Sequence, residues 1–153
     1  MRAISENELA HFLVEAKRNT YAAQKGRVAS SRLESKDLGF RCGDYYYLDS
    51  YFGEKDFSGQ EIVYFKDKPI WSMNYYGKML QDEVPQGFIE TLRGALLKVE
   101  VDRPFRGCGT YSQGRYLYKC WSEGTLFIFK GQESIRYGRK VVYCLNFHGG
   151  QIR

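Results

Sequence analysis

The chain has 153 residues, which is the size of one ordinary globular domain. Hydrophobic residues make up 43% of it and charged residues 27%, so it can bury a core and does not have the composition of a disordered protein. No apolar run approaches the roughly 20 residues that cross a bilayer, and the N-terminus lacks the apolar core of a secretion signal. We therefore expect one soluble, cytoplasmic domain over residues 1–153 without membrane contact.

Charge and cysteine usage argue against two common classes of ligand. The net charge is +5, but the basic residues are spread along the chain and no RNA-binding signature is present, so we do not expect nucleic-acid binding. The 4 cysteines form no C-x-x-C pair and only 2 histidines are available, so no zinc-ligand spacing exists. No glycine-rich phosphate loop is present either. We expect no metal, no cofactor and free thiols.

A first helix is predicted to begin at Ser5. The pattern Ser5-x-x-Glu8 is a capping box, in which the two side chains satisfy early backbone N–H groups. An apolar stripe at helical spacing then indicates the face that packs on the core. The stripe consists of Leu9, Phe12, Leu13 and Ala16.

Residues 22–38 fit no regular element, because they are rich in Ser, Lys, Arg and Gly and lack apolar periodicity. A segment of this length inside a compact domain is usually a lid, a binding loop or disordered, so we predict a mobile loop. Strands are predicted after it, because runs of aromatic and aliphatic residues follow. They cover residues 45–52, 61–65 and 70–76, with a turn at 66–69 between the last two.

The second half of the chain is predicted to follow the same plan. Pro85 is a favourable residue at a helix start, and an apolar stripe follows it. That stripe consists of Phe88, Ile89, Leu92, Leu96 and Val99. Strands are then predicted at residues 115–121, 126–129, 133–137 and 141–147.

An internal repeat relates the two halves. The sequence FSGQE at residues 57–61 recurs as FKGQE at 129–133, and NYYG at 74–77 recurs as NFHG at 146–149, both with an offset of 72 residues. We therefore predict an α+β fold made of an internally duplicated helix-plus-antiparallel-strands unit, with halves at about 1–80 and 81–153. The two units would be related by a pseudo-two-fold axis, with two helices packed on antiparallel sheet.

The first copy carries aromatic and polar residues that would meet in a cleft between the two copies, which is the default place for a ligand. Aromatic rings would form the walls, Glu61 and Asp49 would be acidic anchors for a cation, and Arg32 would belong to a lid formed by the 22–38 loop. The candidate ligand-binding residues are Arg32, Tyr47, Asp49, Tyr51, Gln60, Glu61, Trp71, Asn74, Tyr75 and Tyr76. The alternative is structural: a tight bend at Gly59 and a strand exit fixed by Asn74.

The same residues are compatible with two other functions. In an enzyme, Glu61 or Asp49 would be the general base and Arg32 would hold an anionic substrate. A carboxylate with a pKa near neutrality would favour catalysis, whereas an ionised one would favour cation binding. In a protein-interaction module, the basic loop would dock a phage, defence or regulatory partner. The sheet edges of a duplicated unit would also allow a homodimer.

Several motifs resemble those of a bacterial domain family of unknown function, family 5680. They are KRNTYA at residues 17–22, SSR at 30–32, Y-x-DSYFG at 47–53, F-x-GQE at 57–61 and W-x-MNYYG at 71–77. Members of this family stand alone or follow an XRE-type helix-turn-helix, so the resemblance implies a bacterial cytoplasmic protein associated with transcription regulators. Because the first predicted helix begins at Ser5, we expect no helix-turn-helix ahead of it and no direct DNA binding.

The predicted architecture is also similar to the effector-binding domains of the gyrase-inhibitor-like group. In that group a pseudo-two-fold aromatic cleft binds small, often cationic molecules, and a Glu neutralises their charge. The resemblance implies a ligand-binding cleft of the same kind here, although those domains begin each repeat with a strand.

Overall fold

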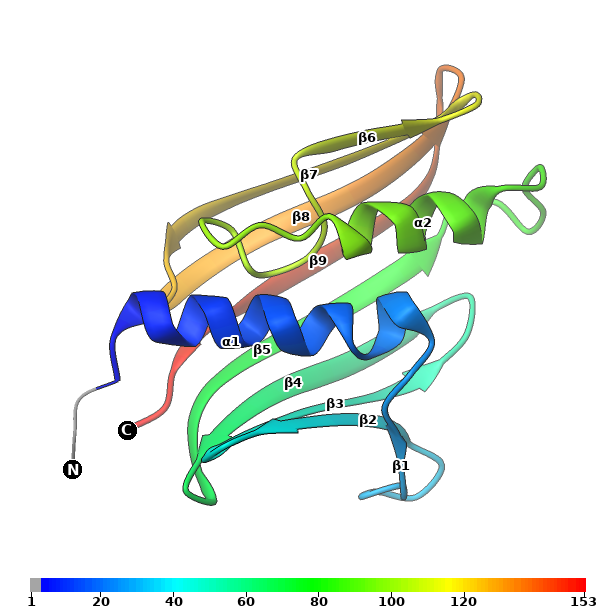
Figure 1. Ribbon diagram of the computed structural model, residues 1–153. Coiled ribbons are helices and arrows are strands. Elements are labelled where there is room, and N and C mark those ends of the chain that lie inside the picture. The colour runs from blue at the N-terminus through cyan, green and yellow to red at the C-terminus, as the bar shows by residue number, and fades with distance from the viewer. Residues whose placement is uncertain (1–3) are drawn as a thin grey trace.

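The computed structural model describes residues 4–153, so the first three residues of the predicted domain lie outside the described range. Over residues 4–153, a pair of helices packs on one face of a nine-stranded antiparallel sheet, as Figure 1 shows. The helices are α1 (Glu6–Arg18) and α2 (Phe88–Leu97), with a short 3-10 helix, η1 (Tyr21–Ala23), after α1. The predicted order of helix, strands, helix, strands is confirmed.

The nine strands form two groups along the chain, one after each helix. The first five are β1 (Arg27–Val28), β2 (Lys36–Cys42), β3 (Tyr45–Gly53), β4 (Phe57–Phe65) and β5 (Lys68–Met79). The other four are β6 (Thr110–Gln113), β7 (Tyr116–Thr125), β8 (Ile128–Tyr137) and β9 (Lys140–Gln151). Their spatial order is β1-β2-β3-β4-β5-β9-β8-β7-β6, so β5 and β9 join two meanders into one sheet.

Helix α1 forms for the reasons that the sequence indicates. Ser5 accepts a hydrogen bond from the backbone N–H of Glu8 at 3.2 Å, and acidic residues in the first turn and basic ones in the last favour the helix dipole. Helix α2 begins after Gly87, whose φ of 102° suits glycine, so Pro85 lies ahead of the helix instead of starting it. Within the predicted stripe of α2, Ile89 is exposed.

Three predictions about the strands need correction. Residues 22–38 are not one loop, because they contain η1 and β1 and end inside β2. The turn between β4 and β5 is only Lys66-Asp67, both with positive φ, which is the geometry of a two-residue hairpin turn. Residues 126–129 and 133–137 were expected to be separate strands, but residues 128–137 form the single strand β8.

Gly59 and Gly131 are the residues that allow β4 and β8 to be continuous. They do not make tight bends, because each lies inside a strand. A Cβ atom at Gly59 would overlap the ring of Tyr75, and one at Gly131 would overlap the ring of Phe147. Each glycine therefore makes room for an aromatic ring on the neighbouring strand, on the face that the helices cover.

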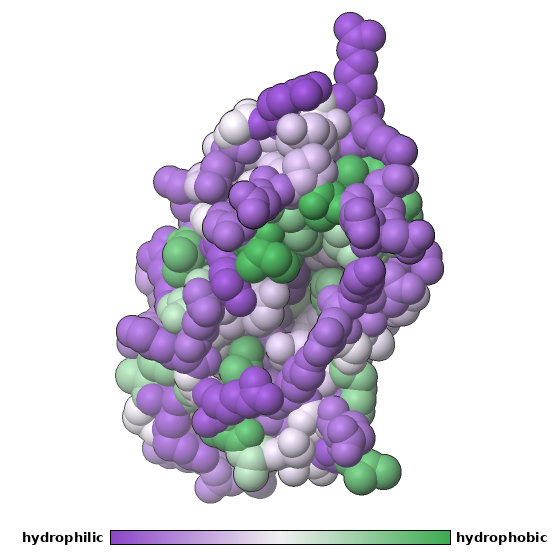
Figure 2. Space-filling view, turned by 90° about the vertical axis from the view of Figure 1, so that its right-hand side faces the viewer, coloured by the Kyte–Doolittle hydropathy of each residue, from purple (hydrophilic) through white to green (hydrophobic). Residues whose placement is uncertain are grey.

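The core fills the space between the two helices and the sheet. The largest fully buried side chains include Trp71, Tyr47, Tyr118 and Tyr143. Neither helix of residues 4–153 has the length and apolar character that crossing a membrane requires. Figure 2 shows the end of the molecule that lies to the right in Figure 1, where a hollow with a hydrophilic rim opens into the interior.

Candidate functional site

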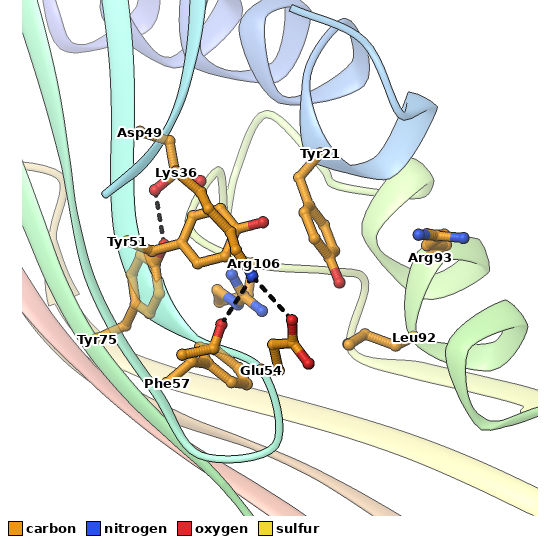
Figure 3. A pocket seen from close by; sticks show the side chains of 11 residues that line it. Tyr21, Lys36, Asp49, Tyr51, Glu54, Phe57, Tyr75, Leu92, Arg93 and Arg106 are labelled. Atoms are coloured by element: carbon orange, nitrogen blue, oxygen red, sulfur yellow. Dashed lines mark hydrogen bonds and ion pairs between the residues drawn. The ribbon is translucent and has the colours of Figure 1, made fainter. Parts of the chain in front are cut away.

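A cavity of about 240 Å³ lies between the sheet and two helical elements. Its sheet side is formed by the first meander, which comprises the strands before α2, and its other side includes residues of η1 and α2. Figure 3 shows its lining side chains. Four aromatic rings form most of the walls: Tyr21 of η1, Tyr51 of β3, Phe57 of β4 and Tyr75 of β5. The rings of Tyr21 and Tyr51 meet edge to face with centroids 6.3 Å apart, and those of Phe57 and Tyr75 do so at 6.1 Å.

Asp49 is the acidic group at the closed side of this cavity. It lies on β3 directly opposite Glu61 of β4, and both side chains are buried. The hydroxyl of Tyr75 donates a hydrogen bond of 2.6 Å to Asp49 Oδ1. Burial and then the charge of Glu61 raise the pKa of Asp49 to about 7, against the opposing effects of the Tyr75 hydrogen bond and the Lys17 charge. Asp49 therefore takes up and releases a proton near neutral pH.

The carboxylate of Glu61 forms an ion pair with a lysine of α1. Lys17 Nζ donates to Glu61 Oε2 and, at 2.6 Å, to the backbone oxygen of Phe105. Burial lowers the pKa of Lys17, and the charge of Glu61 opposes this effect. Beside this pair a second, smaller hollow of about 30 Å³ is lined by Lys17, Tyr47, Asp49 and Glu61 among others. The carboxylate of Glu61 is thus neutralised within the protein.

Glu133 has a still more complete set of partners. Arg106 Nε and Nη2 donate to its two oxygens at 3.1 and 2.8 Å. The hydroxyls of Tyr118 and Tyr143 donate to the same carboxylate at 2.6 and 2.7 Å. Arg106 also lines the cavity, with its guanidinium carbon 5.5 Å from the centre of the Tyr75 ring. Glu133 therefore holds Arg106 in the cavity wall.

The buried charges do not balance. Among the described residues this region holds three buried carboxyl groups, on Asp49, Glu61 and Glu133, and two buried cations, on Lys17 and Arg106. Glu61 and Glu133 each have a cation of their own, whereas no ion pair of Asp49 is found within residues 4–153. A buried carboxylate without a counter-charge is stabilised by several hydrogen bonds, holds a proton or attracts a cation, and Asp49 has one side-chain donor, the Tyr75 hydroxyl, among the described residues. Asp49 is in this position, and it faces the cavity.

The predicted site residues divide into those near the cavity and those away from it. Asp49, Tyr51 and Tyr75 line the cavity, and Tyr47 and Glu61 line the smaller hollow next to it. Trp71 lies in the core, where its Nε1 donates to the backbone oxygen of Leu126 at 2.8 Å. Of the two predicted acidic residues, Asp49 borders the cavity, whereas Glu61 forms an ion pair with Lys17.

The other four predicted residues lie on the opposite face of the sheet, because neighbouring side chains along a strand point to opposite sides. Gln60 donates to Asn74 at 2.9 Å, and Tyr76 is half exposed. Arg32 donates to Ser50 Oγ at 3.0 Å and stacks over the Phe52 ring, so it is no lid for the cavity.

Some lining residues were not predicted. A signal existed for Lys17, because it continues the apolar stripe of α1 one turn beyond Leu13, where a charged residue is unusual. No local pattern pointed to Tyr21, Arg93 or Arg106, which come from separate elements and meet only in the folded chain.

No group of three or more His, Cys, Asp or Glu side chains that could hold a metal is found within residues 4–153. All four cysteines are free thiols. Burial and the charge of Glu133 raise the pKa of Cys120 to about 12, so this thiol is not a reactive thiolate.

Comparison with known proteins gives one match. Residues 49–152 match the model of the family described as Domain of unknown function (DUF5680). The matched range contains both Glu61 and Glu133 and leaves out Lys17 and Tyr21, although the resemblance noted from the sequence begins at residue 17. No curated protein and no solved structure matches the chain.

Proposed function

The chain belongs to the family Domain of unknown function (DUF5680), and we propose that it binds a small organic molecule in the cavity beside Asp49. The observation that carries the proposal is a buried carboxyl group without a cation of its own among the described residues, facing a cavity with aromatic walls. A ligand that donates a hydrogen bond or carries a positive charge would complete this group.

The size of the cavity limits the ligand. At roughly 30 Å³ for each water molecule in the liquid, the volume of about 240 Å³ corresponds to about eight waters. A single aromatic ring with short substituents fills a comparable space. The edges and faces of Tyr21, Tyr51 and Phe57 offer such a ring both stacked and edge-to-face contacts.

Asp49, not Glu61, is the anchor in this proposal. Replacing Lys17 as the partner of Glu61 would leave a buried ammonium group without a counter-charge, which is costly. A cation at Asp49 needs no such exchange, because it takes the place of the proton that Asp49 holds below a pKa of about 7. We expect binding of a cationic ligand to release a proton at pH 6 to 7, and to strengthen as pH rises to 8.

An enzyme is the second candidate function, because one observation favours it. The pKa of Asp49, raised to about 7, suits a general base at neutral pH, and its hydrogen bond from Tyr75 would orient it. The reaction would begin with removal of a proton from the bound molecule by Asp49. Binding and catalysis would use the same cavity, so the binding experiment comes first.

The finer context also belongs to this proposal. A duplicated origin is supported by matched positions: Tyr47 and Tyr118 occupy corresponding places beside Glu61 and Glu133 in the two meanders. A bacterial, cytoplasmic protein that senses a molecule for a transcription regulator fits a ligand cavity of this kind. A homodimer through the edge strands β1 and β6 is compatible with the binding role.

Benzylamine is a suitable first probe, since it combines one ring with one cation. We expect it to shift the amide NMR signals of residues around the cavity in the wild type, and we expect the uncharged benzyl alcohol to bind at least about tenfold more weakly. Asp49→Asn should abolish the preference for the amine. Asp37→Asn is the matched control, because Asp37 is a buried carboxylate on β2 whose partners Ser31 and Ser50 lie away from the cavity.

Equal affinity of wild type and Asp49→Asn for benzylamine would contradict the proposal. Native mass spectrometry of the purified protein, before and after denaturation, would identify the natural ligand if one is retained. If the protein releases this molecule in a chemically altered form, the assignment changes from binding to catalysis.

A further inference from the structure

Arg93 is the second group in the cavity that lacks a partner of opposite charge. It comes from α2 and lies across the cavity from Asp49 on β3, as Figure 3 shows. Its guanidinium carbon is 5.9 Å from the centre of the Tyr21 ring. Its Nε is buried and has no hydrogen-bond partner within residues 4–153, and no ion pair of this side chain is found there. A buried donor without an acceptor is costly, so its retention calls for an explanation.

The other charges on the cavity wall are already paired. Lys36 Nζ lies 3.4 Å from Glu54 Oε1 and 3.4 Å from the backbone oxygen of Gly53 at the rim. Arg106 is held by Glu133 on the inner side. Among the described lining residues this leaves one acidic and one basic group without a counter-charge, Asp49 and Arg93, and the two form no ion pair with each other.

We infer that the cavity takes a bipolar aromatic molecule, with a cationic or hydrogen-bond-donating group at Asp49 and a carboxylate or similar oxyanion at Arg93. This inference rests on the proposed function and names its ligand class. Guanidinium groups bind carboxylates through two parallel N–H···O bonds, and no carboxylate of the described residues is paired with Arg93, which lines the cavity. The guanidinium carbon of Arg93 lies 5.9 Å from the centre of the Tyr21 ring, within the range of a cation–π contact.

The electrostatics of the cavity agree with this polarity. Burial, Tyr21 and the charge of Asp49 raise the pKa of Tyr51, and the charges of Arg27 and Arg93 oppose this rise, so Asp49 and Arg93 both lie within electrostatic reach of Tyr51. A cation alone would satisfy Asp49 and would be repelled by Arg93. A ligand with both charges meets an opposite charge at each end.

Three probes test this ligand class: 4-(aminomethyl)benzoate, which has both charges, benzylamine, which has only the cation, and benzoate, which has only the anion. Affinities are measured at pH 8 by calorimetry and by NMR titration. We expect 4-(aminomethyl)benzoate to bind the wild type about tenfold more tightly than benzylamine, the gain of one charge-assisted contact. Arg93→Gln should remove this gain and leave benzylamine bound at least as well as before.

Arg115→Gln is the matched control. Arg115 also stacks on a tyrosine, with its guanidinium carbon 4.8 Å from the centre of the Tyr137 ring, and it does not line the cavity. This variant should keep the full preference for 4-(aminomethyl)benzoate. Misfolding is excluded as the cause of a lost preference if the cavity variant keeps the dispersion of the wild-type proton NMR spectrum. Its melting temperature should also be close to that of the wild type.

The outcomes separate this inference from the proposed function. Benzylamine binding that depends on Asp49, without any gain for 4-(aminomethyl)benzoate, would overturn the bipolar ligand and keep the binding function. An unchanged gain in Arg93→Gln would overturn the role of Arg93. No binding of any probe would overturn both, and tighter binding of benzoate than of 4-(aminomethyl)benzoate would reverse the assigned role of Asp49.

Discussion

The two buried glutamates, Glu61 on β4 and Glu133 on β8, lie in corresponding places and have different neighbours. On the adjacent strand Glu61 is opposite Asp49, whereas Glu133 is opposite Cys120. On the other side, the ring that fills the space above the strand glycine is Tyr75 in the first meander and Phe147 in the second.

The difference separates a carboxylate with a full set of partners from a carboxyl group that borders a cavity. Glu133 receives four hydrogen bonds from Arg106, Tyr118 and Tyr143, which satisfy a carboxylate completely. In the first meander, Asp49 has only the Tyr75 hydroxyl as a side-chain hydrogen-bond donor among the described residues, and Asp49 borders the cavity. Asp49 and Tyr75, in place of Cys120 and Phe147, therefore give the first half the carboxyl group that the proposed function uses.

The largest expected effect on stability comes from removing the charge of Glu133, and removal of the charge of Glu61 provides the comparison. Glu133→Gln should lower the free energy of unfolding by about 3–5 kcal/mol, because it leaves the buried Arg106 without a counter-charge. Glu61→Gln should cost clearly less, since Asp49 can ionise and neutralise Lys17 in its place. Urea unfolding at pH 7 measures both.

The same pair has an internal check. In Glu61→Gln the pKa of Asp49 should fall below about 7, because the neighbouring negative charge that raises it is gone. Carbon NMR of the Asp49 carboxyl group follows this titration. A loss of stability in Glu61→Gln as large as in Glu133→Gln would contradict the compensating role of Asp49.

The next effect is the pH dependence of stability. The pKa of Asp49 is raised from 3.8 to about 7 in the folded chain, so between these values the folded state holds a proton that the unfolded state has released. The free energy of unfolding should therefore fall as pH rises from 4 to 7, by up to about 4 kcal/mol at about 1.4 kcal/mol for each pKa unit. Asp49→Asn should lack this contribution to the decline.

Urea titrations of wild type and Asp49→Asn at several pH values provide the test. Above pH 7 the free energy of unfolding of Asp49→Asn should be at least as large as that of the wild type. The reason is that the variant does not bury the charge of an ionised Asp49. Parallel pH profiles for the two proteins would exclude a raised pKa at Asp49.

Single hydroxyl groups should have a smaller effect. Tyr75→Phe and Tyr143→Phe each remove one hydrogen bond to a buried carboxyl group and should each cost about 1 kcal/mol. Only Tyr75→Phe should raise the pKa of Asp49 further, because that hydroxyl stabilises its ionised form. A rise in both variants would mean that the two sites are coupled through Arg106.

The smallest effect is expected at Arg93. Because this side chain has no hydrogen-bonded partner at Nε among the described residues, Arg93→Gln should lower the free energy of unfolding by no more than about 0.5 kcal/mol, and removal of the unsatisfied donor favours a gain instead. Arg106→Gln, from the same cavity wall, should be far more costly because it leaves Glu133 unpaired. Thermal unfolding monitored by circular dichroism compares the two; equal losses would mean that Arg93 has a structural partner.

Local patterns were enough for most of the fold. The capping box at Ser5, the apolar stripes and the runs of aromatic residues each act within a few residues, so they predicted both helices and the helix–strand order. The strand glycines were misinterpreted, since a glycine that makes room for a ring on the next strand is indistinguishable in sequence from one in a turn.

The site was predicted incompletely, for reasons of distance along the chain. Asp49, Tyr51 and Tyr75 were predicted as aromatic and acidic residues of the first copy, and they line the cavity. Arg32 was assigned to a lid and Trp71 to the cleft wall, whereas Arg32 packs against Ser50 and Phe52 and Trp71 lies in the core. Periodicity predicts spacing along a strand, but not which face a neighbouring loop covers.

The sequence by itself determined the two helices and the helix–strand order, because these follow from capping, periodicity and composition. Only the tertiary structure decided which carboxyl group is left without a counter-charge. Lys17 from α1 reaches Glu61, and Arg106 from the segment after α2 reaches Glu133, across separations that no local pattern records. Coulombic pairing depends on distance in space, so the carboxyl group without an ion pair, Asp49, can be identified only when all these side chains are brought together.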